Sequence, residues 1–251
     1  MGLIDNLIAH VEKNKLSSDK KVIFDSFLQK GFPTIKDEEW KYTSLKKIIT
    51  SDYVLLHNEN HYEESSVERY SLGINDKIIF CNGKLHSYPN IKGVKITGFS
   101  DFKCRNNDSI VELNSALANS GFKITIDKNI VIKSPLEILF LNTTKNSFSQ
   151  YRNQILVGEN SEVKIVEQIQ DLSNSSTLVN YFTHINCSKN TKVEYNKIQN
   201  NYKESKLIDC MNIFQQQDST CEVNTLIFGG QFVRNNLNFE QNGSNCESNM
   251  N

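Results

Sequence analysis

The second half of the chain alternates apolar and polar residues in short segments separated by polar turns. Residues 155–157 and 163–165 flank one such turn, and residues 237–239 continue the alternation near the end. A period of two places the apolar side chains on one face of a β-strand. Because no helical pattern intervenes, each strand must bury its apolar face against another strand.

The turns recur every 25 to 30 residues. They are segments 159–163, 189–193, 217–223 and 242–246, and Arg152-Asn153-Gln154-Ile155 is echoed by Arg234-Asn235-Asn236-Leu237. This spacing is too long for a hairpin and predicts a β-helix, in which each strand stacks on its copy one coil away. The same alternation also permits an antiparallel sandwich with long loops.

The first thirty residues have the pattern of two helices. Apolar residues within 3–11 fall on one helical face, and a second apolar face spans 23–28. Ser17-Ser18-Asp19 can cap the second helix, and Gly31 is typical of its end. We therefore expect a helical hairpin.

An extended segment should follow at Pro33, because proline disfavours helix in the residue before it. Residues 45–49 then predict a short third helix with its apolar side chains inward. Trp40 and Tyr42 lie between these elements. We interpret both as aromatic anchors that dock the helices on the next layer.

The segment 57–72 is polar and without periodicity, which predicts a loop. Asn82-Gly83 between apolar runs predicts a hairpin with a type I′ turn, and residues 109–118 predict a helix that ends before Gly121. We place residues 1–120 in an N-terminal region, a helical hairpin plus a small α/β part. Residues 121–251 form the first coils of the core domain.

Composition changes this picture little. The 251 residues are 38% hydrophobic and 23% charged with a net charge of -1, which predicts a globular chain with no nucleic acid partner. No apolar run is long enough to span a bilayer, so we expect a cytoplasmic protein without membrane association. The six cysteines form no C-x-x-C pair and are expected to be free thiols.

Some β-helix proteins cleave polysaccharides, which requires paired carboxylates on one face. The carboxylates of the coils occupy different phases of the repeat, so we interpret them as a solvated polar face. They are Glu162, Glu167, Glu194, Asp209, Asp218, Glu222 and Glu240. The sequence therefore does not predict a sugar-cleaving site.

Two other groups bear on metal binding. Cys221 and Cys246 fall at nearly equivalent repeat positions and could hold a soft metal. We favour the interpretation that they are small side chains that fill an inward turn position. His184 has no second histidine in phase. We assign no catalytic, cofactor-binding or metal-binding residue.

Four motifs resemble the SufB/SufD family of iron-sulfur cluster assembly scaffolds, and SufD more than SufB. They are Pro33-Thr34-x-x-Asp37-Glu38-Glu39-Trp40-Lys41-Tyr42-Thr43, Pro135-Leu136-Glu137-Ile138, Arg152-Asn153-Gln154 and Gly229-Gly230-x-x-Val233-Arg234-Asn235-Asn236-Leu237. Their order along the chain makes the combination specific. The resemblance implies a right-handed parallel β-helix after a small helical and α/β region. It carries over structural roles only, for Trp40, Tyr42, Gly229, Gly230, Arg234, Asn235 and Asn236.

The resemblance also implies a function. It suggests a non-enzymatic scaffold subunit that works with a SufB-like paralogue and a SufC-like ATPase on a transient iron-sulfur cluster. The family residues implicated in building the cluster lie in later coils and match nothing in residues 1–251. We therefore expect an N-terminal fragment that binds no cofactor itself. The alternatives are a carbohydrate-active β-helix enzyme and a generic cytosolic interaction module.

Overall fold

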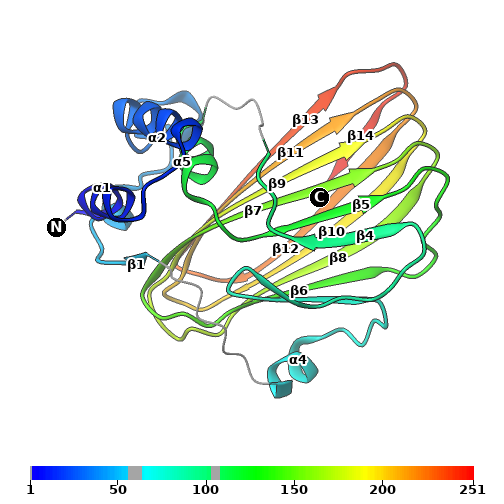
Figure 1. The fold of residues 1–251 in the computed structure, drawn as a ribbon, viewed down its shortest axis with the longest axis horizontal. Helices are drawn as coiled ribbons and strands as arrows, with labels where there is room; N and C mark the ends of the chain where they lie inside the picture. Colours follow the sequence, from blue (N-terminus) through cyan, green and yellow to red (C-terminus); the bar gives the residue numbers. More distant parts are fainter. Residues whose placement is uncertain (1, 56–63, 103–107) are drawn as a thin grey trace.

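The computed structural model describes residues 2–55, 64–102 and 108–251. Two seven-stranded sheets, sheet A and sheet B, lie face to face and enclose an apolar lumen (Figure 1). The long strands of each sheet pair in parallel. The fold is thus a parallel β-helix, as the repeat predicts, and the sandwich alternative is wrong because its sheets would be antiparallel.

Sheet A has the strand order β13-β11-β9-β7-β5-β4, with β1 paired to β7. Its strands are β1 (Val54–Leu55), β4 (Val94–Gly98), β5 (Phe122–Ile126), β7 (Ser147–Val157), β9 (Leu178–Cys187), β11 (Lys206–Gln215) and β13 (Phe232–Gln241). Sheet B has the order β14-β12-β10-β8-β6-β2-β3. Its strands are β2 (Lys77–Cys81), β3 (Lys84–Ser87), β6 (Leu136–Asn142), β8 (Glu162–Asp171), β10 (Lys192–Asn201), β12 (Thr220–Gly229) and β14 (Glu247–Met250).

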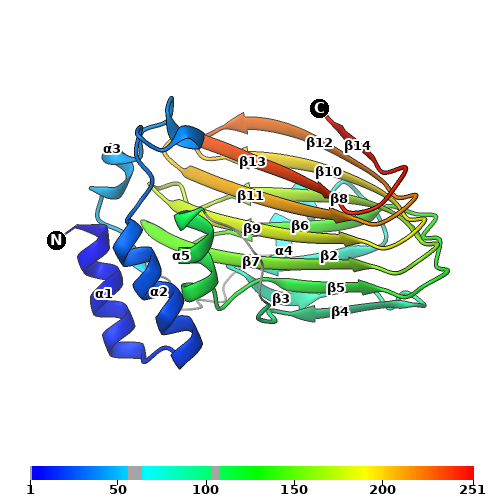
Figure 2. The same cartoon turned by 90° about the horizontal axis from the view of Figure 1, so that it is seen from above.

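The strands of successive coils stack along the solenoid axis (Figure 2), and their register places equivalent residues in columns. Val163, Val193, Cys221 and Ser248 form one lumen-facing column of sheet B. Each residue of a column is covered by its counterpart in the next coil. Alternation of apolar and polar residues along a strand therefore becomes alternation between the lumen and the outer face.

The register corrects one detail of the repeat. Arg152 pairs with Phe182, and its column continues to Asn236, so the echo at Arg234 is displaced by two residues. A displacement of two preserves the face of the strand, and both arginines lie on the outer side of sheet A. Leu237 and Phe239 pack against the lumen cluster, as the alternation predicts.

One corner of the solenoid is built from left-handed residues. Asn160, Asn190, Asp218 and Asn245 have φ angles of 57°, 53°, 59° and 55°. Asparagine and aspartate tolerate this conformation better than other residues with a side chain. The Asn190 amide also donates to Asn160 Oδ1 at 2.9 Å. The polar turns of the sequence are therefore a stacked ladder as well as strand breaks.

Helices cover the outer face of sheet A near the start of its strands (Figures 1 and 2). These elements are α1 (Leu3–Asn14), α2 (Ser18–Lys30), the 3₁₀ turn η1 (Glu38–Trp40), α3 (Lys46–Ile49) and α5 (Ser109–Leu117). The predicted helical hairpin, the short third helix and the helix before Gly121 are confirmed. Within the described chain, no helix is both long and apolar enough to cross a membrane.

A further helix, α4 (Glu64–Tyr70), packs on the outer side of sheet B through Val67 and Tyr70, beside Leu139 and Leu141. The predicted loop 57–72 is therefore wrong for residues 64–70, while its part within 56–63 lies outside the described residues. A short helix without a clear apolar period is stabilised here by its docking site, which the local pattern cannot show.

The N-terminal region and the solenoid share apolar packing. Leu3, Phe27 and Trp40 belong to the same buried cluster as Phe182 and Ile208 of sheet A. In addition, β2, β3 and β4 complete the first edge of the two sheets. A division of the chain at residue 120 stays a prediction.

Asn82 and Gly83 form the turn between β2 and β3 with φ angles of 48° and 80°, which confirms the predicted hairpin. A Cβ at position 83 would lie 2.4 Å from the Ser120 Cβ. We expect Gly83→Val to reduce the free energy of unfolding by about 2 kcal/mol or more, because positive φ strains a β-branched residue before any clash is counted. Urea denaturation measures this, and an unchanged midpoint would contradict it.

Candidate functional site

Three charged side chains meet inside the lumen. Lys197 of β10 lies between Glu167 of β8 and Asp209 of β11. Its Nζ is 3.2 Å from Glu167 Oε2 and 2.6 Å from Asp209 Oδ2. The three residues are 0% to 3% exposed. We call them the lumen triad.

The lumen triad is tied to polar groups on both sheets. The Tyr181 hydroxyl of β9 donates a short hydrogen bond to Glu167 Oε1. Gln199 Nε2 donates to Asp209 Oδ2 at 2.8 Å and to Asn235 Oδ1 of β13 at 3.0 Å. A continuous polar network therefore crosses the lumen and joins four successive coils.

The triad has one more carboxylate than ammonium. Burial alone would lower the pKa of Lys197, but the charges of Asp209 and Glu167 outweigh it and raise that pKa. Burial raises the pKa of Asp209, and the neighbouring Glu167 charge adds to the effect. Lys197 is therefore held charged, and Asp209 keeps its proton to a higher pH than an exposed aspartate.

These positions correct the interpretation of the coil carboxylates. Glu167 and Asp209 are not on a solvated face, while the other five are exposed or half-buried as expected. The sequence nevertheless contains a pattern that indicates burial of these charged side chains. Glu167 stands two residues from Ile165 and Ile169, so it lies in the apolar phase of its strand, and Lys197 does the same after Val193 and Tyr195.

A second constellation joins the N-terminal region to β13. The Arg234 guanidinium lies over the Trp40 ring, 4.1 Å from its centroid. It donates to Thr43 Oγ1 at 3.0 Å and, in a short hydrogen bond, to the Glu39 carbonyl. We call this contact the arginine clamp. It brings together the two sequence motifs that are farthest apart along the chain.

Asp108 supports the arginine clamp from a third element. Its Oδ1 accepts from the Ile110 N–H at the start of α5, at 2.9 Å, and its Oδ2 accepts from Trp40 Nε1 at 3.4 Å. Burial raises the pKa of Asp108. Trp40 is 2% exposed, which confirms its predicted anchoring role. Tyr42 is 93% exposed, so its prediction as an anchor is wrong, because the turn after Trp40 points it outward.

Arg152 makes an equivalent contact deeper in the same face. Its guanidinium lies between the rings of Phe102 and Phe182, 4.4 and 4.5 Å from their centroids, and donates to Asn114 Oδ1 of α5 at 3.1 Å. His184 also packs near the Phe102 ring, 5.7 Å away. Burial, aided by the Arg152 charge, lowers the pKa of His184 to about 4. The imidazole is therefore neutral at physiological pH.

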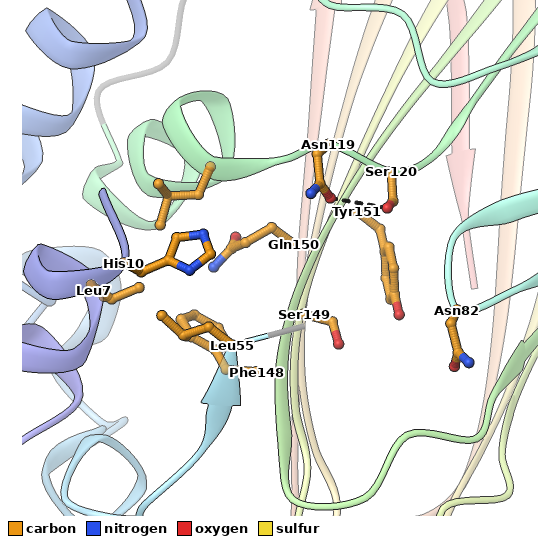
Figure 3. A pocket seen from close by; sticks show the side chains of 11 residues that line it. Leu7, His10, Leu55, Asn82, Asn119, Ser120, Phe148, Ser149, Gln150 and Tyr151 are labelled. Atoms are coloured by element: carbon orange, nitrogen blue, oxygen red, sulfur yellow. Dashed lines mark hydrogen bonds between the residues drawn. The ribbon is translucent and has the colours of Figure 1, made fainter. Parts of the chain in front are cut away.

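A small cavity lies between α1 and β7 (Figure 3). His10 of α1 and Gln150 of β7 point toward each other, while Ser149 and Tyr151 lie on the opposite side of the strand. The volume is about 30 Å³. That volume admits a water molecule or two, which is far below the size of a sugar or a nucleotide.

The cysteine positions differ from the predicted stack. Cys221 stands in register with Ser248, whereas Cys246 lies in the preceding turn, where its thiol donates to the Gly243 carbonyl at 3.3 Å. The two are not at equivalent positions, so the stacking that would let them share a soft metal does not occur. The favoured interpretation, a small side chain at a turn position, describes Cys246, whereas Cys221 is buried in the lumen. Across the described ranges, no group of three or more potential metal ligands occurs. Cys104 falls outside them.

Gly229 and Gly230 form the bend between β12 and β13. Their φ angles are 70° and 86°, and a Cβ on Gly229 would lie 2.4 Å from the Asn201 carbonyl oxygen. Only glycine fits this close approach. The bend directs β13 so that Arg234 reaches Trp40.

Comparisons with known proteins match two segments of this chain, one in the N-terminal region and one in the solenoid. A family profile described as "SUF system FeS cluster assembly, SufBD core domain" matches residues 140–251, and one described as "SufBD protein N-terminal region" matches residues 4–79. The iron-sulfur cluster assembly protein SufD of Escherichia coli is 21% identical over 96% of this chain and 59% of its own length. An iron-sulfur cluster assembly SufBD family protein of Synechocystis is 21% identical over 94% of the chain and 58% of its own length. The chain thus spans about three fifths of these relatives.

Replacing Arg234 with lysine tests the arginine clamp. Lysine keeps the charge but lacks the planar fork that stacks on Trp40 and donates to two oxygens. We expect Arg234→Lys to lower the free energy of unfolding by about 1–2 kcal/mol. The matched control is Arg69→Lys on α4, whose side chain is exposed; equal effects of the two changes would argue against the clamp.

Removing the ammonium of the lumen triad should be more severe. Lys197→Met leaves Glu167 and Asp209 buried without their cation, at a cost of about 3–5 kcal/mol. Asp209→Asn leaves the Lys197 ammonium paired with the Glu167 carboxylate, so the remaining ion pair has no net charge. This change should therefore lower the free energy of unfolding by less. Chemical denaturation of both variants measures this order, and the reverse order would contradict it.

The Asp209→Asn variant also tests how the free energy of unfolding depends on pH. The raised pKa of Asp209 means that the folded state holds a proton that the unfolded chain releases near pH ~3.9. Its contribution to stability is therefore complete below that pH and is lost as pH rises through the folded pKa. Unfolding free energies measured at successive pH values above about 4 should shift in favour of Asp209→Asn as pH rises. Parallel profiles for the two proteins would be inconsistent with a raised pKa.

Proposed function

The chain belongs to the SufB/SufD family of iron-sulfur cluster assembly proteins, and from this premise we propose that it acts as a SufD-like, non-enzymatic scaffold. The observation that carries the proposal is the arginine clamp. It joins the segment matched by the N-terminal profile to the segment matched by the core profile, through Trp40 and Arg234. The two family regions are thus built into one structural unit.

The use of charged groups supports a scaffold role. Inside the lumen, Lys197 is shared by two carboxylates. On the outer face of sheet B, Lys164 Nζ lies 2.7 Å from Glu194 Oε2 of the next coil. These charges join coil to coil. The alternative hypothesis, a sugar-cleaving enzyme, instead requires a pair of carboxylates that is free to act on a sugar.

Partners and cargo follow from the family. We propose that the protein works in the cytosol with a SufB-like paralogue and a SufC-like ATPase, and that an iron-sulfur cluster is cargo of the assembly. The E. coli relative is named as an iron-sulfur cluster assembly protein, which supports the cargo. A generic interaction module would share the fold but not these partners.

Co-purification tests the proposal. The full-length protein, tagged and expressed from its native gene, should retain the SufB-like and SufC-like proteins encoded in the same genome. Loss of both partners in quantitative mass spectrometry would overturn the proposed role. A parallel assay for cleavage of polyuronides addresses the enzyme alternative, and turnover that disappears in Glu222→Ala would favour that alternative.

A further inference from the structure

Two Asn-Gly pairs occur in solenoid turns, and their surroundings differ. Asn82-Gly83 joins β2 to β3, and Asn242-Gly243 opens the turn between β13 and β14. An asparagine followed by glycine is prone to attack on its side-chain amide by the next backbone nitrogen, since glycine has no Cβ to hinder the approach. Whether the reaction proceeds depends on access and freedom of the side chain.

The side chain of Asn242 is exposed and loosely held. Its Nδ2 makes one long contact, 3.5 Å to the Glu240 carbonyl. Backbone hydrogen bonds of this turn include Asn242 N–H to the Gln215 carbonyl, while the Gly243 N–H donates to no backbone carbonyl of the described chain. The amide of Asn242 is thus accessible, and the attacking Gly243 nitrogen is not held by a backbone hydrogen bond within the described residues.

The side chain of Asn82 is buried and held at both ends. It is 2% exposed, its Nδ2 donates to Thr143 Oγ1 at 2.9 Å, and its Oδ1 accepts from the Thr143 N–H at 2.9 Å. Gly83 is packed against Ser120 and Tyr151. Rotation of the amide toward Gly83 would break both hydrogen bonds in a closed site.

We propose that Asn242 is a site of spontaneous deamidation, and that the fold protects Asn82 from the same reaction. The Gly243 nitrogen loses its proton and bonds to Asn242 Cγ, the Cγ–Nδ2 bond breaks, and ammonia leaves. Water then opens the cyclic imide at either carbonyl. The products are aspartate or isoaspartate, and the step needs no oxidant or reductant.

The product would alter the last turn of the solenoid. Isoaspartate adds one carbon to the backbone beside Gly243, where a Cβ would already lie 2.2 Å from the Gln217 backbone nitrogen. The Gly243 carbonyl also accepts from the Cys246 thiol. The close approach to residue 217 stacks this turn on the one below it, while the hydrogen bond from Cys246 holds the turn itself together. Deamidation therefore weakens the attachment of β14 to β12 and provides an age-dependent change in this surface.

The test is peptide mapping by mass spectrometry after prolonged incubation of the folded protein in mildly alkaline buffer, with isoaspartyl methyltransferase labelling to detect isoaspartate. We expect modification at Asn242 to be at least about tenfold faster than at Asn82, because Asn82 must wait for local opening. Asn242→Ser should abolish the signal from this peptide.

Incubation in concentrated urea provides the control for sequence reactivity. There, the two Asn-Gly pairs should react at similar rates, which shows that the fold causes the difference. An unmodified Asn242 in the folded protein, or equal rates at both sites before unfolding, would overturn the proposal. A lower melting temperature of the modified fraction would support the weakened turn. An unchanged melting temperature would contradict it.

Discussion

Stacking of one coil on the next is the constraint on which this molecule depends. The backbone groups of each long strand are paired with the strand one coil away, as β10 is with β8 and β12. No coil can satisfy its backbone hydrogen bonds or cover its apolar residues alone. The columns that result decide the environment of each residue, because a side chain lies either in the lumen or on the outer face.

That constraint explains the lumen triad. Once Glu167, Lys197 and Asp209 fall in the inward phase, their strands cannot turn them out without moving every apolar neighbour outward. The charges are therefore stable only as a group. A buried ion cluster is weak evidence for extra stability, since desolvation offsets the attraction, but it favours one register over others. The triad is best understood as a device for alignment across the lumen.

The outer face of sheet A is stabilised in a different way from the lumen. Helices cover it, and arginine side chains join the two layers by stacking on aromatic rings, Arg152 between Phe102 and Phe182 and Arg234 on Trp40. A planar guanidinium can stack and donate hydrogen bonds at once. These contacts link distant parts of the chain, and they agree with a scaffold in which the N-terminal region is held rigidly on the core.

The sequence by itself determined the strand alternation, the helical hairpin and the Asn82-Gly83 turn, because period and turn residues are local properties. The 25 to 30 residue repeat favoured a β-helix, but the parallel pairing of the coils excluded the sandwich. Trp40 and Arg234 could each be singled out, but their contact joins residues far apart along the chain and needed the folded structure. The burial of Glu167 and Asp209 was also a tertiary matter. The apolar phase of Glu167 is compatible with burial, yet only Lys197, beside Glu167 in sheet B and opposite Asp209 of sheet A, makes buried carboxylates tolerable. The exposure of Tyr42 was decided by the direction of one turn, which no periodicity records.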